Sequence, residues 1–138
     1  RAQAELGAQA VDVASILATE VDVLAPCALG ATLNAQSIPT LQAKLIAGAA
    51  NNQLATAADG DALQARGITY LPDYLVNAGG IISVAREYRN EGEEAKVMAE
   101  VGLIRERVAE LLERVRVGGQ TPAREADAWA RSLLVKPA

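Results

Sequence analysis

The stretch Leu45-Ile46-Ala47-Gly48-Ala49-Ala50-Asn51-Asn52 is a short apolar run that stops at two polar residues. Two similar runs flank it: Val21-Asp22-Val23-Leu24-Ala25 stops at Pro26, and Ile68-Thr69-Tyr70-Leu71 stops at Pro72-Asp73. Each run is too short for a helix, and two are rich in β-branched or aromatic residues, so we predict three strands. They begin at residues 21, 45 and 68, which leaves a connecting segment of similar length between successive strands.

Helix signals occupy these connections. Ser37 and Pro39 predict the start of one helix, and residues 59–66 predict another that ends at Gly67. Strand–helix–strand spacing of this size is typical of right-handed βαβ units in a parallel sheet, so the predicted fold class is α/β. Upstream, residues 1–6 read as a helix end stopped at Gly7, and residues 8–13 as a weak further strand.

The last third of the chain has a helical pattern. Its apolar residues recur every three or four positions and would lie on one helix face: Val97, Val101, Ile104, Val108, Leu111 and Val115. Gly118-Gly119 ends this helix, and Thr121-Pro122 starts another as N-cap and first residue. The apolar face fits packing against the body of the chain or a subunit partner, or a short coiled-coil seam.

Composition excludes several functions. The 138 residues include no histidine and one cysteine, which excludes a histidine-dependent nucleophile, an internal disulfide and a multi-cysteine metal site. We therefore expect no metal. A net charge of −4 and 3% aromatic residues argue against a nucleic-acid partner. The longest uncharged stretch, residues 23–43, is too polar to span a membrane, so we expect a cytoplasmic protein. Because the chain begins without methionine, we expect a processed, trimmed or excised N-terminus.

Catalytic groups are scarce. The proton carriers are Asp, Glu, Tyr and three lysines. Lys44 begins a strand, at the end opposite the expected ligand edge, and Lys96 and Lys136 read as solvated helix charges. We predict no catalytic residue in this chain. Neither a GxGxxG motif nor a Walker loop is present.

The strand ends hold the candidate ligand site. Ligands of open parallel sheets bind at the carboxyl ends of the strands, where Pro26-Cys27, Asn51-Asn52 and the segment from Pro72 to Asn77 should gather. Each of these residues could instead serve only the fold: the two asparagines can turn the chain, Asn77 can cap the next helix, and Cys27 can be an inert, half-buried thiol. Their convergence on one edge favours a ligand site, and the glycines after Asn77 would let a ligand approach the backbone.

Four ordered motifs carry a family resemblance: Ala25-Pro26-Cys27-Ala28-Leu29-Gly30, residues 47–54, Arg66-Gly67-Ile68, and Pro72-Asp73-Tyr74-Leu75-Val76-Asn77-Ala78-Gly79-Gly80. Together they resemble the C-terminal part of the Glu/Leu/Phe/Val amino acid dehydrogenases, nearest the leucine, phenylalanine and valine branch. The resemblance implies the later strands of a Rossmann-type sheet followed by C-terminal helices. It also implies NAD as cofactor and reversible oxidative deamination of an apolar L-amino acid to a 2-oxo acid and ammonia. Residues 1–90 would be the downstream part of the NAD-binding domain, and residues 91–138 a helical segment packed on it or on a partner subunit.

The same resemblance assigns site residues. Pro26, Cys27 and Ala28 match the loop beside the nicotinamide ribose, and Asn77 matches the residue contacting the nicotinamide side of the cofactor. Asn51 matches the residue that orients the substrate, while Ile81 and Val84 match positions that line the pocket for its side chain.

The family's catalytic lysines and glycine-rich loop lie upstream of the matched region. The chain alone is therefore expected to be inactive without an N-terminal substrate domain, and the parent enzyme is expected to be a homo-oligomer. Two further hypotheses stay open. The chain could be a non-catalytic interaction or oligomerisation module, or a half-Rossmann unit that completes its sheet by pairing with another copy or fragment.

Overall fold

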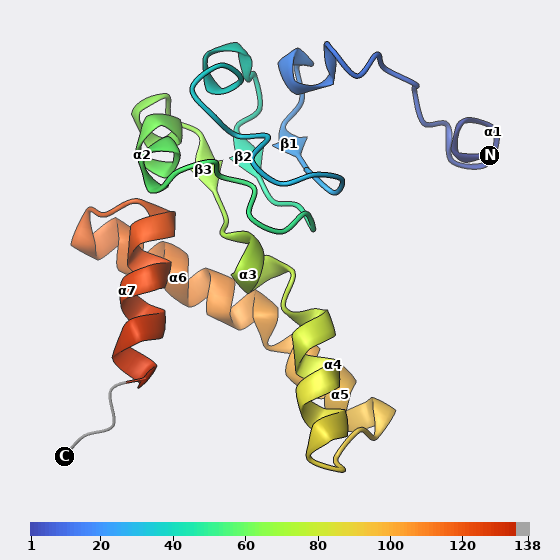
Figure 1. Ribbon diagram of the computed structural model, residues 1–138, viewed down its shortest axis with the longest axis vertical. Helices are drawn as coiled ribbons and strands as arrows, with labels where there is room; N and C mark the ends of the chain where they lie inside the picture. Colours follow the sequence, from blue (N-terminus) through green and yellow to red (C-terminus); the bar gives the residue numbers. More distant parts are fainter. Residues whose placement is uncertain (135–138) are drawn as a thin grey trace.

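Three parallel strands form the centre of the computed structural model, which describes residues 1–134. These are β1 (Val23–Leu24), β2 (Leu45–Ile46) and β3 (Thr69–Tyr70), and they form one sheet in the order β1-β2-β3 (Figure 1). Val23 pairs with Leu45, and Leu45 pairs with Thr69. The three predicted strands and their parallel arrangement are confirmed, although each is shorter than its apolar run. Because the three strands are parallel, the segments after all of them leave from the same edge of the sheet.

The two connections between the strands differ. α2 (Ala57–Ala65) joins β2 to β3 and ends at Gly67, whose φ is 72°. The predicted helix is confirmed, and it begins earlier because Thr56 and Asp59 form a capping box in which the Thr56 N–H donates to the Asp59 carboxylate at 2.7 Å.

The helix predicted from Ser37 is wrong, because only the 3₁₀ turn η2 (Ile38–Thr40) forms there. The Ser37 hydroxyl donates backwards to the Thr32 carbonyl at 2.6 Å instead of capping a helix. Ile38 and Leu41 are both buried by this single turn, and the chain is already extended at Leu41.

The N-terminal segment lies along the outside of the molecule. α1 (Ala2–Leu6) ends at Gly7, which has a φ of 66°, as the sequence predicted. The strand predicted over residues 8–13 is wrong: an Asp12 turn and η1 (Ile16–Ala18) follow α1 instead. Val13 is 89% exposed, and no strand among residues 1–134 lies beside this segment to pair with it. Figure 1 shows α1 standing away from the rest of the chain.

Five helices follow the sheet. They are α3 (Asp73–Val76), α4 (Gly79–Tyr88), α5 (Glu94–Gly102), α6 (Ile104–Gly118) and α7 (Pro122–Leu134). The single helix predicted through the apolar stripe is wrong, because Gly102, a poor helix former, lies beside a break at Leu103. The predicted start of α7 is confirmed, since the Thr121 hydroxyl accepts the Arg124 N–H at 3.3 Å.

The apolar stripe packs within the chain. Leu111 is fully buried, and the other five stripe residues are partly buried. α6 contacts α3 and α7, and α5 contacts α4 and α6. Packing against the body of the chain, the first of the sequence interpretations, is therefore what the structure has.

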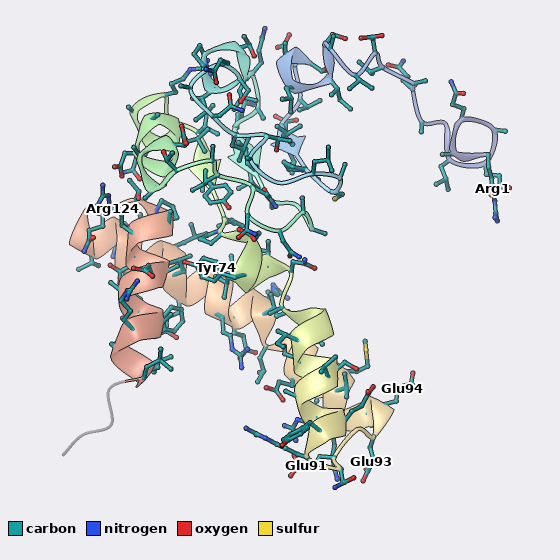
Figure 2. The ribbon with its side chains drawn as sticks, in the orientation of Figure 1. Arg1, Tyr74, Glu91, Glu93, Glu94 and Arg124 are labelled. Carbon is teal, nitrogen blue, oxygen red and sulfur yellow. The ribbon has the colours of Figure 1, made fainter. Side chains whose placement is uncertain are left out.

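The hydrophobic core lies around the sheet, η2 and α2. Its buried residues are Leu33, Ile38, Leu41, Ile46, Leu63, Ile68 and Tyr70. α7 packs against α2 and β3. Arg124, labelled in Figure 2 near the start of α7, pairs with Asp61 of α2 at 2.5 Å. These contacts hold α7 against the sheet, and α6 contacts α3, the helix that follows β3. The division into residues 1–90 and 91–138 stays a prediction.

Candidate functional site

Two asparagines meet at the carboxyl edge of the sheet. The Asn77 side-chain N–H donates to the Ala49 carbonyl at 2.8 Å and to the Asn51 side-chain oxygen at 3.3 Å. Asn51 follows β2, whereas Asn77 ends α3 after β3. Asn77 does not cap the next helix: Ala78 is the N-cap of α4 and makes no side-chain capping bond. The interpretation of Asn77 as the cap of the next helix is therefore wrong: it is the C-cap of α3, and its side chain links two strand ends.

The turn after β2 is held from two sides. Asn52 has a φ of 54°, so the interpretation as a turn residue is correct for this asparagine. Its N–H donates to the Asp73 carboxylate at 2.8 Å, and its carbonyl accepts the Ala31 N–H at 2.7 Å. The first bond comes from the β3 side and the second from the loop after β1. Asn51 is thus presented from a turn that both neighbouring strand ends restrain.

The loop after β1 lies directly against the end of β2. The Ala50 N–H donates to the Pro26 carbonyl at 2.9 Å, and the Ala49 N–H donates to the Cys27 sulfur at 3.5 Å. A Cβ on Gly48 would collide with the Pro26 backbone and ring, so only glycine fits there. Cys27 is exposed, and the expectation of a half-buried thiol is wrong, since the loop holds its sulfur at the surface.

Pro26, Cys27 and Ala28 also line a groove of about 280 Å³. Its remaining walls are almost wholly apolar and come from the segment before β1, from β1 and from the loop after it: Val13, Ile16, Leu17, Leu24, Ala25, Leu29 and Thr32. Of these three predicted cofactor-binding residues, Pro26 and Cys27 also accept hydrogen bonds from Ala50 and Ala49, the residues directly before Asn51.

The two predicted pocket residues lie on α4. Ile81 is 67% exposed and Val84 is 60% exposed, whereas Ile82 between them is buried. Residues 81 and 84 are three positions apart, so both lie on the same solvent-facing side of the helix. Their role in contacting a substrate side chain stays a prediction.

The lysines lie away from this edge. Lys44 precedes β2 and pairs with Asp22 at 2.8 Å, with both side chains exposed. Lys96 pairs with Glu93 at 2.8 Å on α5. Lys136 lies outside the described residues. Lys44 thus lies at the start of a strand, and Lys96 is an exposed charge on a helix, as the sequence interpretation of each predicted.

Sequence reasoning placed Asp73 at this edge within the segment from Pro72 to Asn77, but it assigned no role to Asp73 or to Tyr70. The buried Tyr70 hydroxyl donates to the Asp73 carboxylate at 3.0 Å. Burial, together with the negative charge of Asp73, raises the pKa of Tyr70 far above its usual value, so the hydroxyl keeps its proton. The sequence signal for Asp73 is its position: it follows Pro72 shortly after the third strand, and residues at that place lie at the carboxyl edge of the sheet.

Fold and site together define a class. The chain is an α/β protein with a parallel sheet whose polar loop residues converge at the carboxyl ends of the strands, the usual ligand position in such sheets.

Comparison with known proteins identifies the family. The sequence profile for glutamate/leucine/phenylalanine/valine dehydrogenase matches residues 2–117. The chain belongs to this family. It is 47% identical over 134 residues to a leucine dehydrogenase of Bacillus cereus, covering 97% of this chain and 36% of the relative. It is 40% identical to a valine dehydrogenase of Streptomyces albus, covering 89% of this chain and 34% of the relative.

A solved structure agrees with this assignment. The crystal structure of L-tryptophan dehydrogenase from Nostoc punctiforme matches with a TM-score of 0.90 and 39% identity, covering 95% of this chain and 39% of that one. The chain thus spans little more than a third of the length of these relatives. Within residues 1–134, no helix is both long and apolar enough to cross a membrane.

Proposed function

We propose that the chain is the C-terminal cofactor-domain portion of an NAD-dependent L-amino acid dehydrogenase. The reaction would be reversible oxidative deamination of an apolar L-amino acid to a 2-oxo acid and ammonia. The observation that supports this most directly is the Asn51–Asn77 pair at the carboxyl edge of the sheet. The relatives named above are dehydrogenases of leucine, valine and tryptophan, which supports an apolar substrate.

The donor set fits the nicotinamide end of NAD. Within residues 1–134, the Asn77 side-chain oxygen and the Asn51 side-chain nitrogen form no hydrogen bond, which leaves one acceptor and one donor at this edge. A carboxamide group is itself a neutral donor and acceptor, so neutral amides can orient it without adding charge. When bound, NAD would accept the hydride from the substrate carbon.

Each predicted residue has a binding task in this proposal. Asn77 and the loop of Pro26, Cys27 and Ala28 hold the nicotinamide and its ribose. Asn51 orients the substrate, and Ile81 and Val84 contact its side chain. A lysine in a separate substrate domain supplies the proton chemistry, so the chain alone is inactive. The whole enzyme would be a cytoplasmic homo-oligomer.

A hybrid enzyme tests this proposal. The chain replaces the matching 36% of Bacillus cereus leucine dehydrogenase, and reduction of NAD by L-leucine is followed. We expect activity in the hybrid, and a large loss in Asn51→Ala and Asn77→Ala. Gln42→Ala, which removes an exposed amide elsewhere on the surface, serves as the matched control and should leave activity unchanged. A folded hybrid in which both asparagine variants keep normal kinetics would favour the non-catalytic interaction module.

Cys27 provides a second readout that needs no turnover. It is the chain's one cysteine, so peptide mass spectrometry can follow its alkylation separately from the cysteines of the relative. We expect saturating NAD to slow alkylation of Cys27 in the hybrid, and Asn77→Ala to weaken that protection. An alkylation rate independent of NAD would contradict placement of the loop beside the cofactor.

A further inference from the structure

We propose that Asp73 is the positioning residue that sets the geometry of the Asn51–Asn77 pair. This inference rests on the proposed function, in which the Asn51–Asn77 pair binds the cofactor and the substrate; it names the residue that holds the pair in place. Asp73 lies at the start of α3, after β3, and makes hydrogen bonds to both segments that carry the asparagines.

Three hydrogen bonds meet at Asp73. One carboxylate oxygen accepts the Asn52 N–H at 2.8 Å, and the other accepts the Tyr70 hydroxyl at 3.0 Å. Its backbone carbonyl accepts the Asn77 N–H at 2.7 Å. A single residue therefore holds the backbone next to Asn51 through its side chain, and the backbone of Asn77 through its main chain.

The Asp73 side chain is itself fixed. Tyr70 is 3% exposed, so its hydroxyl has little freedom to turn away from the carboxylate. Pro72 is buried directly before Asp73 and restricts the backbone there. Because Tyr70 holds one carboxylate oxygen and Pro72 restrains the backbone, the other oxygen is a fixed acceptor for the Asn52 N–H.

The turn that Asp73 holds needs such an acceptor. Asn52 has a φ of 54°, a left-handed conformation that asparagine adopts more readily than most residues, and the bond to Asp73 fixes the direction of its N–H. On the opposite side, a Cβ at Gly30 would lie 2.7 Å from the Asn51 carbonyl, so the turn is pressed against the loop after β1. Without the carboxylate, the Asn52 N–H loses its partner, and the turn can relax away from Asn77.

Two conservative variants separate positioning from bulk stability. Asp73→Asn keeps an oxygen for the Asn52 N–H and can turn its amide nitrogen toward the Tyr70 oxygen, so it should rescue most of the effect of Asp73→Ala. Tyr70→Phe removes one of the two restraints on the carboxylate and leaves the Asn52 bond in place. The matched control is Asp127→Ala, since Asp127 lines the same cavity as Asp73 but pairs with Arg131.

The experiment uses the hybrid enzyme with L-leucine and NAD as probes. In Asp73→Ala we expect kcat/KM for L-leucine to fall about tenfold or more, because the variant loses one well-placed hydrogen bond to a charged group. We also expect NAD to protect Cys27 less from alkylation. Asp73→Asn should stay within about threefold of the parent, Tyr70→Phe should lie between them, and Asp127→Ala should match the parent. Thermal unfolding of each variant is measured alongside.

The outcomes separate this inference from the proposed function. If Asp73→Ala lowers the melting temperature but leaves kinetics and Cys27 protection unchanged, Asp73 is only structural and the inference is wrong. If Asn51→Ala and Asn77→Ala are also without kinetic effect, the proposed function fails as well. Should Asp73→Ala not fold, Tyr70→Phe decides: a fall in kcat/KM with normal stability supports positioning, and unchanged kinetics overturn it.

Discussion

The Asn77 side-chain nitrogen lies 3.3 Å from the Asn51 side-chain oxygen, although 26 residues separate the two in sequence. The same nitrogen donates to the Ala49 carbonyl at 2.8 Å, so Asn77 joins both the backbone and a side chain at the end of β2. The contact depends on parallel strands, since only then do the segments after β2 and β3 leave from one edge.

The first prediction concerns energetic coupling within this pair. In the hybrid enzyme, Asn51→Ala and Asn77→Ala should each raise the KM for L-leucine. The loss of binding free energy in the double variant should be smaller than the sum of the two single losses. A neutral hydrogen bond of this kind predicts a coupling of about 0.5–1.5 kcal/mol. Steady-state kinetics of the four proteins measure it. Strict additivity would mean that the two amides act independently.

The second prediction concerns Gly48. A methyl group at this position would collide with the Pro26 backbone and ring, so Gly48→Ala should destabilise the chain by about 1–3 kcal/mol. Gly102→Ala is the control, because a Cβ there meets nothing within 4 Å. Urea unfolding followed by circular dichroism compares the two. Equal stability of both variants would show that the loop after β1 does not press against β2 in solution.

The third prediction concerns the apolar face of α6. Leu111 is fully buried and Leu112 is 40% exposed, so the neighbours form a matched pair. Leu111→Ala should lower the free energy of unfolding by about 2–5 kcal/mol, and Leu112→Ala by far less. If Leu112→Ala were the more damaging change, the outer face of α6 would carry the packing, as expected for a helix that needs a partner subunit.

The fourth prediction concerns pH. The Arg124 guanidinium hydrogen-bonds the Asp61 carboxylate and lowers the pKa of Asp61 from its usual 3.8. Since the folded-state pKa lies below the unfolded one, the pair stabilises the fold above pH 3.8, and this contribution is lost as the pH falls through the lowered value. Both groups are exposed, so the effect should be small and should weaken in salt.

Thermal unfolding of the parent and Asp61→Asn across this pH range provides the measurement. The parent should be the more stable near neutral pH, and the two curves should converge in acid. Arg124→Gln should abolish the difference between parent and Asp61→Asn. A difference that persists at the lowest pH would mean that Asp61 acts through packing instead of charge.

The fold was largely predictable from the sequence where local signals agree. The three apolar runs are strands, and Gly67, Gly119 and Thr121 mark helix ends as their residue types predict. The absence of a strand over residues 8–13 was not predictable, because such a segment forms a strand only where another strand lies beside it. A serine such as Ser37 can either cap a helix or donate its hydroxyl to a nearby backbone carbonyl. In the structure the Ser37 hydroxyl donates to the Thr32 carbonyl and caps no helix.

The site was predictable in part. The rule that residues after parallel strands gather at one edge of the sheet predicted that Asn51 and Asn77 lie near each other, and in the structure their side chains are hydrogen-bonded. The role of Asp73 was not identified, because it depends on which backbone N–H the Asp73 carboxylate reaches after the chain has folded. A sequence pattern over a few neighbouring residues does not reveal a hydrogen bond to a residue 21 positions away.

The amide pair has a consequence for how such an enzyme responds to acidity. Neither Asn51 nor Asn77 carries a proton that is gained or lost in ordinary buffers, so the amide pair itself presents the same donor and acceptor in acid and in alkali. On the proposed function, the pH optimum of the reaction must come from groups other than these two amides. Substitutions at those other groups can therefore move the pH optimum without any change in the amide pair.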